Sequence, residues 1–194
     1  MSLPRILAFS GSTRVGSFNQ QLVSIVAEGA RVAGASLTVI SLRDFPLPLF
    51  DQDLEAAVGL PDNARKLKAL MLAHHGFLIA SPEYNSSVSG VLKNAIDWVS
   101  RAESDTETPL IAFRGKVAAI LSASPGRLGG IRGLVHLRSI LGNIGMLLLP
   151  EQVTISRAHE AFDGEGALKD ARKRQQVTGL GASLVKLLGQ LAVT

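Results

Sequence analysis

The sequence predicts a doubly wound α/β fold, in which a five-stranded parallel sheet carries helices on both faces. Short, almost wholly apolar runs alternate five times with longer segments of helical period, as βα units require. The runs lack polar–apolar alternation, which is typical of parallel strands covered on both faces. Since 194 residues with 46% hydrophobic content suffice for one large core, we expect residues 1–194 to form a single domain.

The elements follow in order along the chain. The expected strands, bounded by glycine, proline or serine, are residues 6–9, 37–40, 77–80, 117–121 and 146–149. The expected helices are residues 18–33, 61–74, 90–101, 131–144 and 168–191, the last with an apolar stripe at Leu180, Leu184, Leu187, Leu188 and Leu191. Two stretches remain irregular, 41–60 and 102–115, and Pro46 and Pro48 predict an extended course for the first.

Composition excludes several kinds of site. The chain has no cysteine, which removes disulfides, thiolate metal sites, iron–sulfur clusters and a cysteine nucleophile. His74 and His75 are adjacent at a predicted helix end, so they do not share a helical face, and helix capping is favoured over metal binding. We therefore expect no metal site. No G-x-S-x-G sequence occurs, which leaves a serine hydrolase without support.

The charge balance favours an anionic cofactor or substrate over nucleic acid. The formal net charge is +4, but the basic residues are scattered, and the cluster at 172–174 suits a solvated helix face. No aromatic residues alternate with basic ones to form a stacking platform. The first apolar run is too short for a signal-peptide core, and no stretch approaches the roughly 18 residues of a membrane span. We expect a cytoplasmic protein with no nucleic-acid or membrane partner.

In a doubly wound sheet the ligand lies beyond the carboxyl ends of the strands. After the first strand, Gly11 and Gly16 permit a tight turn, and short polar side chains and an arginine surround them: Ser12, Thr13, Arg14, Ser17 and Asn19. The following helix directs free N–H groups and a positive dipole end to the same place. A terminal phosphate is the natural occupant, although an ordinary serine-capped helix start remains an alternative.

Two other phosphate-binding loops do not fit this segment. Gly11 and Gly16 have P-loop spacing, but Ser17 and Phe18 stand where that motif needs Lys and Ser or Thr. The G-x-G-x-x-G fingerprint of dinucleotide sites is also missing. The segment therefore suits a mononucleotide.

Small polar residues also follow the third and fourth strands. Residues 81–87 contain Pro82 and the chain's only tyrosine, Tyr84, in a stiff turn that could face a heterocyclic ring or could be a plain surface turn. Residues 122–130 are rich in serine and glycine. Three such loops at one edge of a sheet indicate a ligand site more strongly than any one of them.

These loops resemble a known family. The segments GSTRVGSFN, SPEYNSSVSGVLKNAIDW and SPGRLGG are similar in order and spacing to the NAD(P)H-dependent FMN reductases, which include bacterial quinone, chromate and azo-dye reductases. The resemblance covers roughly residues 5–150 and implies a flavodoxin-like sheet of strand order 2-1-3-4-5. Ser89 stands where many relatives have proline, and it can cap the helix that follows.

The resemblance also implies which residues bind FMN. The set expected at the phosphate is Ser12, Arg14, Ser17 and Asn19, and Phe18 is also expected in the cofactor site; the set expected at the isoalloxazine ring is Pro82, Glu83, Tyr84 and Asn85 on one edge and Ser122, Ser124 and Gly126 on the other. We expect no catalytic side chain, because the cofactor carries the hydride chemistry. Glu83 is expected to be structural.

The implied function is electron transfer from NADPH or NADH through FMN to a quinone, free flavin, azo dye or metal oxyanion, by a ping-pong mechanism. The alternative is a non-enzymatic FMN carrier between protein partners, although such carriers are usually acidic. Trp98 lies at the edge of the apolar arc of residues 91–101, which suits half-buried core or an interface anchor. The resemblance favours a homodimer or tetramer packed through this helix.

Overall fold

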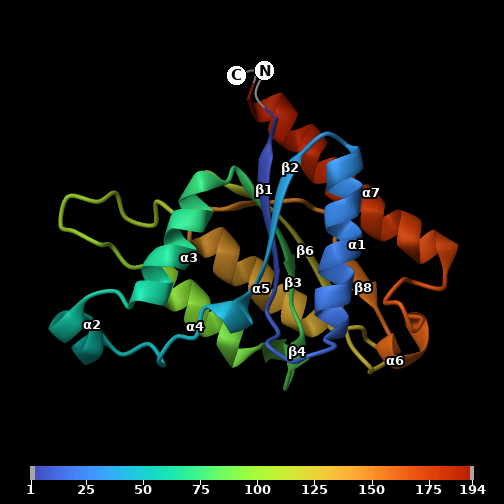
Figure 1. Cartoon of the computed structure of the whole chain (residues 1–194), viewed down its shortest axis with the longest axis horizontal. Coiled ribbons are helices and arrows are strands. Elements are labelled where there is room, and N and C mark those ends of the chain that lie inside the picture. The colour runs from blue at the N-terminus through green and yellow to red at the C-terminus, as the bar shows by residue number, and fades with distance from the viewer. Residues whose placement is uncertain (1–2, 193–194) are drawn as a thin grey trace.

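The structure, a computed structural model, describes residues 3–192, and its centre is a parallel sheet (Figure 1). From one edge the strands are β2 (Ser36–Ser41), β1 (Arg5–Ser10), β3 (Gly76–Ala80) and β6 (Val117–Ala123), and then β7 (Leu147–Leu148) and β8 (Val153–Ile155), which both pair with β6. This is the 2-1-3-4-5 order of flavodoxin-like folds, with the fifth position shared by two short strands. The predicted fold class is confirmed.

The fifth strand differs from the prediction of one strand over 146–149. β7 pairs with the start of β6, at Val117 and Ala118, whereas β8 pairs with its end. Pro150 lies between the two, and it has no N–H to donate to a ladder. The sheet edge is therefore interrupted, and β8 is an element that the apolar pattern did not predict.

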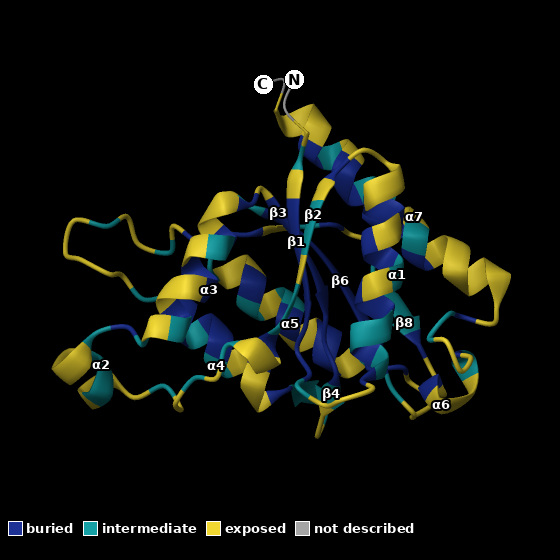
Figure 2. Cartoon of the chain, in the orientation of Figure 1, coloured by how far each residue is buried: buried dark blue, intermediate teal, exposed yellow. Residues whose placement is uncertain are grey.

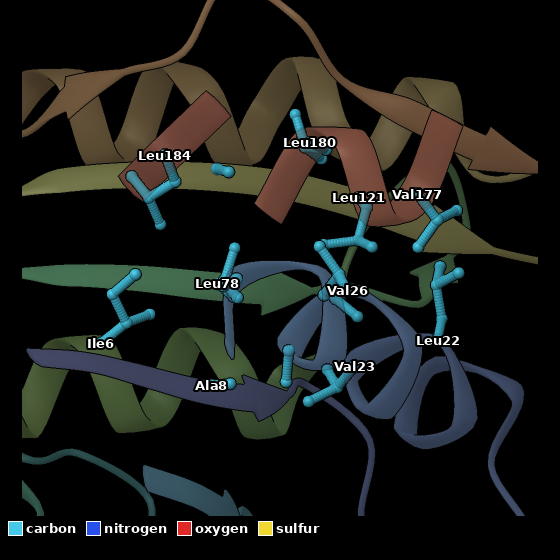
Figure 3. Close-up of a cluster of buried hydrophobic side chains, with 14 of the residues drawn as sticks. Ile6, Ala8, Leu22, Val23, Val26, Leu78, Leu121, Val177, Leu180 and Leu184 are labelled. Atoms are coloured by element: carbon cyan, nitrogen blue, oxygen red, sulfur yellow. The ribbon is translucent and has the colours of Figure 1, made fainter. Parts of the chain in front are cut away.

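Helices cover both faces of the sheet. α1 (Phe18–Val32) and α7 (Ala171–Leu191) pack on one face, while α3 (Asp62–Ala73), α4 (Gly90–Val99) and α5 (Ile131–Asn143) pack on the other (Figure 1). The side chains between α1, α7 and the strands form a continuous apolar cluster (Figure 3). On the predicted α7 stripe, Leu180, Leu184 and Leu188 are buried, but Leu191 is exposed. The central strands β1, β3 and β6 are almost wholly buried, whereas the edge strand β2 is partly exposed (Figure 2).

Helices α1 and α7 approach each other very closely. A Cβ atom added at Gly29 would lie 2.1 Å from the backbone oxygen of Thr178, and one at Gly181 would lie 2.3 Å from that of Val26. Glycine at these positions allows the two backbones to touch. This contact fixes the position of α1 against α7, and the first turn of α1 lies at the ligand-binding edge of the sheet.

The segment 41–60 is more ordered than predicted. It contains the 3-10 turn η1 (Leu42–Asp44) and the helix α2 (Gln52–Val58), which begins at an Asp51 side chain that accepts from the N–H of Asp53 at 2.8 Å. Aspartate at a helix start satisfies N–H groups that have no partner in the helix. The extended course predicted from Pro46 and Pro48 holds only between these two elements.

Trp98 is buried inside the chain. Its side chain is 0% exposed, its indole N–H donates to the backbone oxygen of Pro48 at 2.8 Å, and the Phe50 ring meets it edge-on at 5.0 Å. Asn94 fixes the same segment, because its amide accepts from the N–H of Phe50 and donates to Pro48. The prediction that Trp98 is an interface anchor is wrong, because the segment 45–50 covers the helix edge on which it lies.

Other expectations concern helix ends and membranes. His74 ends α3, and its Nδ1 lies 2.6 Å from the backbone oxygen of Leu70, which confirms C-terminal capping. Within residues 3–192 no helix is long and apolar enough to cross a bilayer. The same residues hold no group of three histidine, aspartate or glutamate side chains that could bind a metal ion.

Candidate functional site

Three loops meet at the carboxyl edge of the sheet, at the bottom of Figure 1. The first loop (residues 11–17) follows β1, the second (81–89) follows β3 and the third (124–130) follows β6. The N–H of Gly11 donates to the oxygen of Ala80, at the end of β3, at 2.8 Å, and the Ser89 hydroxyl joins the second loop to the first by donating to the Gly11 oxygen at 2.5 Å. The loops that the sequence singled out therefore form one surface.

The first loop encloses a pocket of about 270 Å³. Its lining is polar or basic at most positions: Ser12, Thr13, Arg14, Ser17, Gln20, Gln21, Ser41 and Arg43, with Val15 and Gly16. None of these described lining residues is acidic. Two guanidinium groups without a carboxylate between them favour an anionic occupant.

The start of α1 adds to this character. Ser17 is the N-cap residue, yet its hydroxyl makes no hydrogen bond to the helix, and the first turn contains no acidic residue. Gly16 has a φ of +67°, a conformation that glycine adopts without strain. The N–H groups at this helix end are therefore left for a ligand, as in other anion sites at helix N-termini.

Arg14 is held beside the pocket by an aromatic contact. Its guanidinium carbon lies 5.4 Å from the centre of the Phe18 ring, and the Phe18 ring stacks on Phe162 at 5.7 Å. Within residues 3–192, Arg14 has no carboxylate partner, and its only hydrogen bond from the side chain goes to the oxygen of Val15. Phe18 thus orients the arginine rather than facing the other loops.

Two predicted site residues turn their side chains inward. The Asn19 amide donates to the oxygen of Ala123 at 2.8 Å and accepts from its N–H at 2.9 Å, which fastens α1 to the end of β6. The Ser122 hydroxyl is buried beneath Gly130, where an added Cβ would lie 1.9 Å from it. It has no hydrogen-bond partner among the described residues. Both side chains therefore lie buried at the end of β6.

The second loop is a small hairpin that the sequence did not predict. β4 (Glu83–Tyr84) pairs antiparallel with β5 (Ser87–Val88). The two turn residues, Asn85 and Ser86, have φ values of +49° and +66°, the left-handed conformation that a tight hairpin turn requires. Pro82 is buried, whereas Tyr84 is 55% exposed, so the tyrosine is free to contact a ligand or another molecule.

Glu83 ties the hairpin to α5. One carboxylate oxygen accepts from Arg132 at 2.5 and 2.8 Å, and the other accepts from the N–H of Gly133 at 3.1 Å. Burial alone would raise the pKa of Glu83, but the Arg132 and Gly133 hydrogen bonds outweigh it and lower the pKa below its ordinary value. The carboxylate is therefore ionised at neutral pH and has a structural partner.

The third loop is shaped by glycine. Gly129 and Gly130 have φ values of +62° and +89°, and a Cβ at Gly129 would lie 3.0 Å from the backbone of Ser156. Ser124 accepts from the N–H of Gly126 at 3.2 Å, so both predicted residues belong to one turn. Gly126 is exposed there. The third loop thus brings backbone groups and the Ser124 hydroxyl to the site.

The end of β2 contributes residues that the sequence reasoning missed. Ser41 and Arg43 line the first-loop pocket, and Arg43 also lines a neighbouring pocket of about 320 Å³ with Phe45, Pro46 and Val91. Gln20 and Gln21 line the first pocket too, and their amide oxygens are buried without a partner among the described residues. The available signal was the position of residues 41–43 after a predicted strand, since the loops after neighbouring parallel strands lie together.

Ser89 behaves as its residue type predicts. Its hydroxyl accepts from the N–H of Leu92 at 3.2 Å, which confirms that it caps α4. The same hydroxyl donates to Gly11 in the first loop. A proline at this position could make neither bond, so in this chain the cap of α4 also joins two of the three loops.

Comparison with known proteins agrees with this arrangement. Residues 4–160 match the family model described as NADPH-dependent FMN reductase. The chain is 39% identical to an NAD(P)H-dependent FMN reductase of Pseudomonas aeruginosa, over 89% of each chain, and 34% identical to an NADPH:quinone oxidoreductase of Arabidopsis thaliana, over 97% of this chain and 95% of that one. A flavoenzyme NAD(P)H:(acceptor) oxidoreductase from Paracoccus denitrificans has a similar structure, with a TM-score of 0.78 and 26% identity over 97% and 98% of the two chains.

Proposed function

The chain belongs to the NADPH-dependent FMN reductase family, and from that premise we propose that it carries electrons from NADPH or NADH through FMN to a quinone or a similar small acceptor. The observation that carries this proposal is the first-loop pocket. Two arginines, several hydroxyls and a helix N-terminus surround it, and no acidic residue lines it. A terminal phosphate matches that donor set.

In this proposal the FMN phosphate lies in the first-loop pocket. Ser12, Arg14 and Ser17 bind it with side chains and with the N–H groups at the start of α1. Phe18 orients Arg14, and Asn19 holds the helix in place.

The ring of FMN would then lie along the second and third loops. Pro82, Tyr84 and Asn85 border one edge, and Ser124 and Gly126 border the other. Glu83 positions the hairpin through Arg132, and Ser122 contributes backbone only. The loops present backbone groups, which suits the hydrogen-bonding edge of a flavin ring.

The proposed reaction is ping-pong. FMN, held by the first-loop pocket, would supply two-electron redox chemistry between the nicotinamide and the acceptor. The protein's part is to hold the reactants in register and to leave one side of the site open to each in turn. Exposed Tyr84 and Leu128 border that side and offer apolar surface to a planar acceptor. Quinones fit this description, and relatives are named as quinone reductases.

Flavin content tests the cofactor assignment directly. We expect the purified protein to bind about one FMN per chain, since the first-loop pocket fits a single terminal phosphate. Acid extraction followed by chromatography identifies the flavin and its stoichiometry. Recovery of FAD, or failure to bind FMN on reconstitution, would contradict the assignment.

Glu83→Gln should slow flavin reduction by less than about tenfold, about 1.4 kcal/mol in barrier. Its carboxylate is already engaged by Arg132 and Gly133, so it is not placed as a proton donor. Because ionised Glu83 stabilises the fold, the wild type should be more stable than the variant at neutral pH, and this difference should vanish as the pH falls through the lowered pKa. Stopped-flow reduction measures the rate, and a thousandfold fall with FMN bound would make Glu83 catalytic.

We also propose a homodimer that forms through the surface beside α4. Its apolar members are Leu49, 82% exposed on the segment that covers Trp98, and Val91, 41% exposed on α4. Leu49→Asp should therefore weaken association, whereas Val32→Asp, at the equally exposed end of α1, should not. Sedimentation velocity measures both variants. A wild-type protein that is monomeric at micromolar concentration would end this proposal.

A further inference from the structure

Arg43 is a cationic side chain with no assigned role. It lies in η1, directly after β2, and its N–H donates to the Ser41 hydroxyl at 3.2 Å, which fixes the turn that carries it. The side chain is exposed, and within residues 3–192 its guanidinium group makes no hydrogen bond and no ion pair. Surface arginines without a partner are unremarkable alone, so the position of Arg43 matters more than its exposure.

Arg43 lies at the first-loop pocket. Arg43 and Ser41 line it together with Ser12, Arg14 and Ser17, although they come from a different strand of the sheet. The pocket is thus bounded by arginines from the ends of two neighbouring strands, β1 and β2. An anion held there would lie beside an arginine from each of these two strand ends.

One arginine and one helix N-terminus match only the lower end of the charge range of a phosphate monoester. A phosphate monoester carries about −1.5 to −2 charges at neutral pH, while one arginine supplies +1 and a helix N-terminus about +0.5. Arg14 and α1 alone therefore leave about half a negative charge of the dianion unmatched. Arg43 is the other cationic residue in the lining, and no lining carboxylate competes for it.

We propose that Arg43 is a second phosphate-binding residue, which holds the terminal phosphate of FMN together with Arg14. The inference rests on the proposed function. It assigns to the end of β2 a part in cofactor binding that the three loops alone do not provide. The competing role is recognition of the 2′-phosphate of NADPH from the neighbouring pocket, which Arg43 also lines.

The test compares FMN with riboflavin, which lacks the phosphate. In flavin-free full-length protein, Arg43→Gln should raise the Kd for FMN at least about tenfold and change the Kd for riboflavin less than about twofold, as expected for a lost charge-assisted contact. Flavin fluorescence quenching measures both constants. Unchanged riboflavin binding also shows that the variant is folded. Arg31→Gln, at the far end of α1 where Arg31 pairs with Glu28, removes the same charge and should change neither constant.

The outcomes separate this inference from the proposed function. Wild-type protein that binds no FMN contradicts both. Wild-type protein that binds FMN, with Arg43→Gln binding it equally well, contradicts only the role of Arg43. An Arg43→Gln variant that binds FMN normally but has a raised KM for NADPH and an unchanged KM for NADH would show that Arg43 recognises the 2′-phosphate of NADPH instead, which would contradict its role at FMN. An equal loss of FMN and riboflavin would show that Arg43 does not contact the phosphate.

Discussion

Trp98→Ala should lower the free energy of unfolding by about 3–5 kcal/mol, the range for removal of a fully buried large aromatic side chain. The substitution empties the space between α4 and the segment 45–50, and it leaves the Pro48 oxygen without the indole N–H. Phe50, which packs edge-on against the indole, would also lose its partner. Urea unfolding followed by circular dichroism measures the change.

Trp98→Phe is the matched control for this experiment. Phenylalanine keeps most of the apolar volume and removes the N–H, so Trp98→Phe should lower the free energy of unfolding clearly less than Trp98→Ala does. Self-association should survive both substitutions wherever the protein remains folded, because Trp98 has no exposed surface. A variant with wild-type stability that dissociates into monomers would show that Trp98 belongs to an interface after all.

Arg14→Ala should weaken FMN binding by about 1.5–3 kcal/mol, the usual worth of a hydrogen bond to a charged group. Riboflavin binding should change little, because the contact is to the phosphate. The side chain is already held by the Phe18 ring, so little ordering is needed when the phosphate binds. Titration of flavin-free protein with both flavins provides the measurement.

Arg14→Lys separates charge from geometry. Lysine keeps the positive charge but not the planar fork, so its FMN affinity should fall between the wild type and the alanine variant. An equal loss of FMN and riboflavin in Arg14→Ala would place the arginine away from the phosphate. That result would also remove the partner that the proposal for Arg43 requires.

The fold was predictable because buried parallel strands have an unmistakable composition. β1, β3 and β6 are almost wholly apolar runs close to turn-forming residues, and the segments between them are long enough for crossover helices. The fifth strand was not predictable in detail, because its pairing is divided around Pro150 and β8 is only three residues long. Trp98 was misjudged for a different reason. A helical pattern shows which edge a side chain occupies but not which loop returns to cover it.

The candidate site was predictable at the level of loops and less so at the level of side chains. The rule that ligands lie beyond the strand ends identified all three loops. It could not show that Asn19 and Ser122 turn inward, since that depends on a contact of Asn19 with Ala123, far away in sequence, and on the close approach of Gly130 to Ser122. Arg43 was missed because no motif marks it. Its role depends on β2 lying beside β1.

Anaerobic reduction of the FMN-loaded protein tests the central claim most directly. NADPH or NADH alone should bleach the visible flavin absorbance, and a quinone added after removal of the nicotinamide should restore it, because each half-reaction needs only its own partner. This result would distinguish the enzyme from a carrier that serves only protein partners. A bound flavin that neither nicotinamide reduces would contradict the proposed function.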